Sequence, residues 1–223
     1  MKTIVFAEHH NGKFTKSSLE AVSYASAWSA SAGGTCIAVT YGSIDASVLG
    51  TAGANEVWKM DALNAADGDQ VTKLMLAAQK ESGANAIVLS HDLVGKSVAP
   101  RLSVRLNAGL VSGATAIPAG NTVKKNVFSG KAIAHVTVNS ELSIVTVLPN
   151  SYGVNTSGTE CAVNAFNAEV GTARVRVKEV RIEESESIPL PEADKVVSAG
   201  RGMKGPENWG MIEELAKELN AAT

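Results

Sequence analysis

The first half of the chain alternates short apolar runs with longer amphipathic segments, and this alternation constrains the fold more than any other feature. The short runs have the length of strands, and the longer segments repeat apolar residues at the spacing of one helix face. Strands that alternate with helices form a parallel sheet with helices packed on its faces. We expect strands at residues 3–8, 35–41, 56–60, 86–90 and 109–114, and helices at residues 15–32, 43–49, 69–82 and 96–107.

The pattern then changes. Residues 123–128, 131–138 and 142–148 are three strand-like runs separated by short polar turns. No helix fits between them, so they cannot be crossover units, and we expect them as an antiparallel addition to the same sheet. The predicted fold class is therefore α/β, with three layers and a mostly parallel sheet flanked by helices, extended by added antiparallel strands.

The remaining segments suggest a domain boundary. Residues 150–169 are small, polar and irregular, whereas residues 174–182 alternate charged and apolar side chains like an edge strand with one wet face. An acidic, proline-marked stretch follows, and such stretches are typical of linkers. We predict an N-terminal α/β domain at residues 1–185, a linker at 186–194 and the start of a second domain at 195–223.

The composition excludes several classes of protein. A net charge of −2 gives no bulk attraction to nucleic acid. No apolar run reaches transmembrane length, so we do not expect a membrane-embedded chain. The N-terminus enters a strand directly and lacks the features of a signal or transit peptide, so a cytoplasmic location is expected. The two cysteines, Cys36 and Cys161, do not stand at zinc-ligand spacing, and Cys36 is expected as a buried free thiol.

Polar residues follow two of the predicted strands, at the sheet edge where ligands bind in open α/β folds. Glu8, His9 and His10 follow the first strand, and His91 and Asp92 follow the fourth. A metal site built from His9, His91 and Asp92 is geometrically possible, but no spacing rule supports it, and polar loop histidines are the alternative. We predict no metal site.

Two short motifs resemble catalytic signatures but fail on geometry. Ser90-His91-Asp92 has the residues of a catalytic triad, but neighbours along a strand point to opposite faces and cannot form the required chain. Gly95-Lys96-Ser97 matches the end of a phosphate loop, but the upstream glycine of that motif would fall at Ser90. We therefore predict no catalytic constellation in this chain.

One pair of arginines belongs to neither motif. Arg101 and Arg105 lie one turn apart on a predicted helix. Such a pair forms either a solvated helix face or a contact with a partner.

The last stretch of the chain predicts a strand, a glycine-rich turn and the start of a helix. Val196 and Val197 suit a buried strand, and Gly205-Pro206 suits a helix start. Gly200 and Gly202 permit positive φ angles and close approach of the backbone to a ligand. A helix N-terminus after such a turn favours anions. A plain connection between strand and helix is the alternative, because Gly-Arg-Gly is not the dinucleotide-binding motif.

Three segments of the chain resemble the α subunit of an electron transfer flavoprotein. Ala7–Lys13 is similar to the first strand and turn of that family, and Val127–Val138 with Thr146–Pro149 is similar to its later strands. The most specific match is Val197–Trp209, which is close to the family's order of Ser, two glycines, Arg, Gly, then Lys, Glu, Asn and an aromatic residue.

The resemblance implies a cofactor, partners and a role. It implies an N-terminal domain of the adenine-nucleotide-hydrolase-like class, followed by a domain that binds FAD, with Arg201 near the flavin and Gly200 and Gly202 in the cofactor-binding turn. It implies a heterodimer with a β subunit, which carries electrons from acyl-CoA and related dehydrogenases to a quinone reductase. One departure is Ala199, where the family usually has glycine.

The resemblance also implies that most FAD contacts lie beyond Thr223. We therefore expect a truncated α subunit, and no FAD bound to this chain alone. Two alternatives stay open, a small nucleotide-binding module of the same fold and a pure heterodimerisation module.

Overall fold

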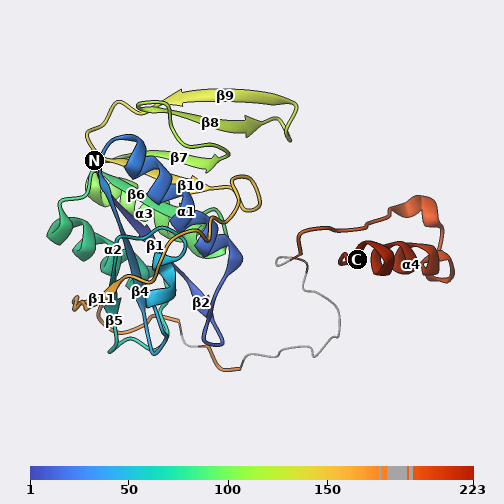
Figure 1. Ribbon diagram of the computed structural model, residues 1–223, viewed down its shortest axis with the longest axis horizontal. Helices are drawn as coiled ribbons and strands as arrows, with labels where there is room; N and C mark the ends of the chain where they lie inside the picture. The colour runs from blue at the N-terminus through green and yellow to red at the C-terminus, as the bar shows by residue number, and fades with distance from the viewer. Residues whose placement is uncertain (176, 180–189, 191–192) are drawn as a thin grey trace. The chain divides into compact units, whose positions relative to one another are not determined.

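The computed structural model describes residues 1–175, 177–179, 190 and 193–223. The chain divides into two compact units, residues 1–176 and residues 177–223 (Figure 1). Each unit is described by itself below.

The first unit is built on one large sheet. Its strands lie in the order β11-β5-β4-β1-β6-β10-β7-β8-β9 among the described residues. All neighbours from β11 to β7 pair in parallel, whereas β8 and β9 pair antiparallel. The strands are β1 (Lys2–Phe6), β4 (Thr35–Tyr41), β5 (Glu56–Met60), β6 (Ala86–Ser90), β7 (Gly109–Ala114), β8 (Thr122–Val127), β9 (Ala132–Thr137), β10 (Ser143–Val147) and β11 (Ala162–Ala165), with a separate hairpin of β2 (His9–His10) and β3 (Lys13–Phe14).

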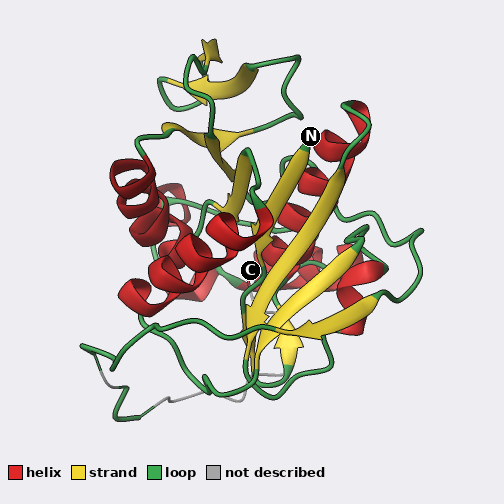
Figure 2. Ribbon diagram, turned by 90° about the vertical axis from the view of Figure 1, so that its left-hand side faces the viewer, coloured by secondary structure: helices red, strands yellow, loops and turns green. Residues whose placement is uncertain are grey.

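Helices cover both faces of the sheet (Figure 2). Helix α1 (Lys16–Ser31) packs on one face, where Val22 joins the buried cluster that contains Val5 and Val88. Helices α2 (Gly68–Ser82) and α3 (Leu93–Leu106) pack on the other, where their apolar residues join the cluster that contains Ile4 and Ile87. Because successive strand residues point to opposite faces, each central strand feeds both clusters. The predicted three-layer α/β class is confirmed.

The helix ends follow from capping chemistry. Thr15 caps α1 as predicted, and Asp67 caps α2 with a full capping box. Asp92 accepts a hydrogen bond from the amide of Gly95, so α3 begins at Leu93, three residues earlier than expected. The predicted helix at 43–49 is only a 3-10 turn, η1 (Ser47–Gly50).

Strand β10 corrects the predicted topology. Strands β8 and β9 form the expected antiparallel pair, but β10 inserts between β6 and β7 and runs parallel to both. Ile144, Val145 and Val147 are all buried. Such a near-continuous apolar run is typical of a central parallel strand, whereas an antiparallel edge strand exposes one face. The chain therefore adds one antiparallel hairpin at the edge of the sheet and then returns to the middle of the same sheet.

The segments near the boundary differ from expectation as well. Residues 150–169 contain β11, which pairs with β5 at the sheet edge, although every residue of β11 is exposed and gives no apolar signal. No strand is assigned to the described residues of the predicted edge strand at 174–182, while 176 and 180–182 lie outside the described residues. Cys36 is a buried free thiol, as predicted.

Among its described residues, the second unit contains one α-helix and two 3-10 turns that are described over their full length. The turns are η3 (Arg201–Met203) and η4 (Pro206–Asn208), and the helix is α4 (Gly210–Leu219). The predicted helix start at Gly205-Pro206 is thus a 3-10 turn. The predicted strand at Val196 and Val197 is present as an isolated parallel bridge between Val196 and Ala222.

One buried carboxylate joins α1 to the end of β10. Glu20 is 2% exposed. Its Oε2 accepts a hydrogen bond from the amide of Asn150 at 2.7 Å, and its Oε1 accepts from the amides of Tyr152 and Gly153 at 2.7 and 2.9 Å. These three donors have no secondary structure to satisfy them, so Glu20 holds the loop after β10 in place.

Replacing Glu20 should therefore destabilise the first unit strongly. Glu20→Ala leaves three backbone donors unsatisfied, and we expect the free energy of unfolding to fall by at least about 3 kcal/mol. Glu20→Gln keeps one acceptor oxygen and should cost less. Urea unfolding of both variants measures this.

Glu81→Ala is the matched control, because Glu81 is exposed on α2. It should change the free energy of unfolding by no more than about 0.5 kcal/mol. Equal stability of the Glu20→Ala and Glu81→Ala variants would contradict the role given to Glu20.

Candidate cofactor-binding turn

The candidate site lies in a strand–turn–helix segment of the second unit. The amide of Val197 donates to the carbonyl of Ala222 at 2.8 Å, and the amide of Ala222 donates to the carbonyl of Lys195 at 3.0 Å. The two strand segments run parallel, with α4 as the crossover between them. This is the local geometry with which a parallel α/β sheet is built.

The turn itself is closed by its own hydrogen bonds. The amide of Met203 donates to the carbonyl of Gly200 at 3.1 Å, which closes η3. The side-chain amide of Asn208 donates to the carbonyl of Met203 at 2.8 Å and so ties η4 to η3. Asn208 therefore has a structural role in the turn that the sequence pattern did not identify.

The strained residue of this turn is Lys204. Its φ is 67° and its ψ is −45°, and the amide of Gly205 donates to the carbonyl of Met203 at 2.8 Å across it. These values describe a γ-turn of the rare, strained kind. Strained backbone of this kind is concentrated at functional sites.

The two glycines differ from expectation. Neither Gly200 nor Gly202 has a positive φ. No atom lies within 4 Å of the position that a Cβ would take at either residue. Their bare backbone is therefore open to an approaching ligand, which is the second of the two properties expected of them. Ala199 also lacks a positive φ, so alanine at this position is not strained.

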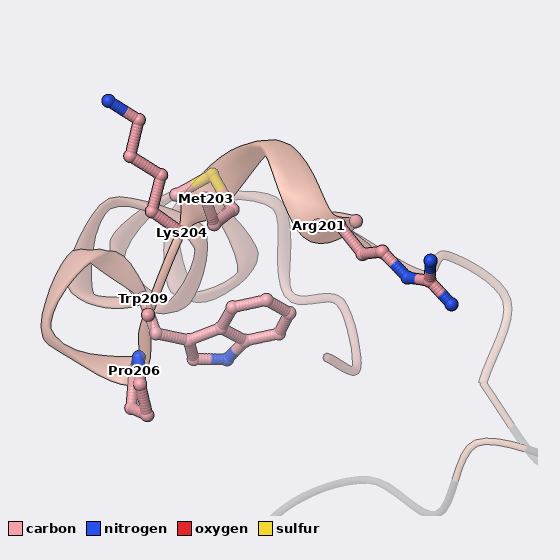
Figure 3. Close-up of a pocket in the computed structure, with 7 residues that line it drawn as sticks. Arg201, Met203, Lys204, Pro206 and Trp209 are labelled. Carbon is pink, nitrogen blue, oxygen red and sulfur yellow. The ribbon is translucent and has the colours of Figure 1, made fainter.

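A hollow of about 450 Å³ lies against the turn. Figure 3 shows the indole of Trp209 below the turn, with Arg201 and Lys204 extending in different directions from it. Among the described residues, Arg201 and Lys204 are the charged side chains that line the hollow, while the carboxylate of Glu207 lies against Gly205 beside it. Two cations, open glycine backbone and an aromatic ring fit one wall of a site for a large anionic cofactor with a ring system. The lining residues are Gly200, Arg201, Met203, Lys204, Gly205, Pro206 and Trp209.

Three histidines of the first unit, His9, His10 and His91, are held in structural contacts. The Nε2 of His9 lies 2.8 Å from the carbonyl oxygen of Tyr41, and His10 lies 3.3 Å from the carboxylate of Glu8. The Nδ1 of His91 lies 2.8 Å from the hydroxyl of Thr146 on β10. Within the described ranges, no three His, Cys, Asp or Glu side chains are grouped to hold a metal ion.

Carboxylates occupy the edge where a nucleotide-binding module would hold phosphate. The chain connections diverge between β1 and β6, and ligands of open α/β sheets bind at such a point. Here Asp92 caps α3. Burial raises the pKa of Glu8, and the nearby charge of Asp92 raises it further, while His10 lowers it. Two neighbouring carboxylates repel phosphate, which disfavours the nucleotide-binding alternative.

Comparison with known proteins places both units in one family. Residues 3–183 match the electron transfer flavoprotein domain, and residues 189–223 match the electron transfer flavoprotein FAD-binding domain. The chain is similar to the electron transfer flavoprotein subunit alpha of Bacillus subtilis, with 27% identity over 99% of this chain and 70% of that protein. It is also similar to the subunit alpha of Syntrophomonas wolfei, with 36% identity over 66% of this chain and 48% of that protein.

Another relative carries a different name. The protein FixB of Clostridium saccharobutylicum is 28% identical over 96% of this chain and 68% of its own length. The matches thus span from about half to 70% of these relatives. In the described part of the chain, no helix combines the length and apolar character needed to cross a bilayer.

The contact between His91 and Thr146 generates a pH prediction. Burial lowers the pKa of His91, and the positive charges of Lys96 and Lys125 lower it further, against the opposing charge of Asp92. The unfolded chain therefore binds a proton more readily than the folded chain as the pH falls through about 6.5. Stability that His91 contributes at neutral pH should be lost below that pH.

We expect His91→Asn to reduce this loss, because asparagine retains a polar group near the Nδ1 position but does not titrate. Urea midpoints of both proteins between about pH 7.5 and 5.5 measure the difference. An identical pH dependence in the two proteins would show that His91 does not cause it.

Proposed function

This chain belongs to the electron transfer flavoprotein family, and we propose that it carries the N-terminal domain of an α subunit together with the opening of its FAD-binding domain. The observation that carries the proposal is the pairing of both family matches, in this order, with a positively charged glycine turn in the second. The three relatives described above support it through their names alone.

The apolar face of α4 supports the second part of the proposal. Met211, Leu215 and Leu219 are 63, 49 and 43% exposed. A contiguous apolar face calls for a covering partner. In the proposed α subunit, the remainder of the FAD-binding domain covers this face and continues the parallel sheet that Val196 and Ala222 begin.

We propose that the glycine turn holds part of FAD. When bound, FAD accepts and releases electrons, which no side chain of this turn can do. Arg201 would stand near the flavin ring and favour added electron density on it. The bare backbone of Gly200 and Gly202 would let the cofactor approach, and Trp209 would exclude water from one side of it.

The role of the first unit in this proposal is to dock a β subunit. The heterodimer would take electrons from acyl-CoA and related dehydrogenases and pass them to a quinone reductase. The chain would thus act as part of an electron carrier, without a catalytic group of its own.

Arg201 provides the test of this function. In the complete α subunit assembled with its β subunit, Arg201→Ala should weaken FAD binding by about tenfold or more, because a charge-assisted contact is lost. It should also lower the flavin's reduction potential, because a positive charge near the ring stabilises added electrons. Flavin fluorescence titration and redox titration measure the two effects.

Lys217→Ala is the control, since Lys217 is an exposed cation in the last turn of α4. It should leave both quantities at their original values. If Arg201→Ala leaves FAD affinity and potential unchanged too, Arg201 is a solvated loop residue and the assignment of this turn fails.

A further inference from the structure

A second positively charged hollow lies in the first unit, and we infer that it docks an acidic segment of a partner protein. The hollow has a volume of about 330 Å³ and lies where the N-terminus of α2 meets α3. We call it the arginine hollow. Its lining residues are Asp67, Gly68, Asp69, Arg101, Arg105, Arg174 and Val175.

The first carboxylate of the arginine hollow is already fully engaged. The Oδ1 of Asp67 accepts hydrogen bonds from the amides of Asp69 and Gln70, both at 2.9 Å. Its Oδ2 accepts from the amides of Arg174 and Val175 at 2.7 and 3.3 Å. These hydrogen bonds hold the pKa of Asp67 below its ordinary value. Asp67 therefore accepts these hydrogen bonds from backbone amides and not from the arginine side chains.

The second carboxylate is engaged as well. Asp69 lies 3.0 Å from the Nζ of Lys73 and 3.3 Å from the guanidinium of Arg105. The hydrogen bond from Lys73 lowers the pKa of Asp69, and Arg105 contributes in the same direction. Arg105 and Lys73 thus form ion pairs with Asp69, and the charge of Arg174 lowers the pKa of Asp69 as well.

Two of the three guanidinium groups in the lining form no ion pair among the described residues. Within the described ranges, neither Arg101 nor Arg174 forms an ion pair, and both are exposed. The guanidinium of Arg101 is packed against Gly68, because a Cβ at that position would lie 2.9 Å from its Nη1. Three arginines thus face two aspartates in the lining, so the arginine hollow carries a net positive charge on a chain whose net charge is −2.

The chemistry of the lining identifies the occupant. Guanidinium forks match carboxylates in bidentate geometry. Among the described residues, no aromatic side chain lines the hollow that could stack on a nucleobase. Val175 is 69% exposed and supplies an apolar contact. An occupant that matches this arrangement is a protein segment that carries two carboxylates beside an apolar residue. The proposal does not depend on the proposed FAD turn.

A hexaglutamate peptide is the probe for this site. We expect isothermal titration calorimetry to detect its binding to the full chain at low salt, and binding should weaken as salt screens the charges. The double variant Arg101→Gln with Arg174→Gln should lose at least about tenfold in affinity. Both side chains are exposed, so the melting temperature should be unchanged.

The matched control removes the same charge elsewhere. Lys124→Gln with Lys131→Gln changes two exposed cations on the β8–β9 hairpin and should bind the peptide as the original chain does. Equal losses in both double variants would overturn the proposal, since bulk charge would then explain binding. Absence of peptide binding to the original chain would overturn it as well. So would binding of inorganic pyrophosphate through Arg101 and Arg174 without peptide binding, because the occupant would then be a free phosphate.

Discussion

The carboxylate of Glu20 is the interaction on which the architecture of the first unit depends. It satisfies three amides of the loop that follows β10, and so it fixes the carboxyl end of β10 against α1. That strand lies between β6 and β7, in the middle of the sheet, although the β8–β9 hairpin separates it from β7 in sequence. A strand that must insert between two others needs an anchor at its end, because its pairing is entirely non-local. Glu20 provides this anchor from α1, the helix that packs on one face of the sheet.

The distribution of charge then separates the regions of the chain by what they can bind. Glu8 and Asp92 place negative charge at the sheet edge where the chain connections after β1 and β6 diverge. The cofactor turn and the arginine hollow each present cations that form no ion pair among the described residues. Anions are therefore repelled from the position at which open α/β sheets usually bind them. They are attracted instead to the glycine turn of the second unit, and independently to the junction of α2 and α3.

How much of this was predictable from the sequence depends on whether the signal is local. The strands β1, β4, β5, β6 and β7 were predictable because each is a short apolar run beside a helix with one apolar face. The insertion of β10 was not, since its apolar run indicates a buried strand but does not say between which two strands it lies. Strand β11 was missed because Ala162–Ala165 is exposed and its pairing with β5 carries no apolar pattern. Arg101 and Arg105 were visible as a pair, but only the fold brings Arg174 beside them.

In the glycine turn, the sequence identified the residues but not the backbone conformation that they adopt. The sequence pointed to Gly200 and Gly202 for their conformational freedom, yet the left-handed residue of the turn is Lys204, whose identity carries no preference for that conformation. The two glycines have ordinary φ angles, and no atom lies near the place of a Cβ at either one. Within the described residues, neither dihedral strain nor close packing requires glycine there. Glycine is therefore an advantage at these two positions only if a ligand contacts their backbone. The cations Arg201 and Lys204 beside them favour an anionic cofactor as that ligand.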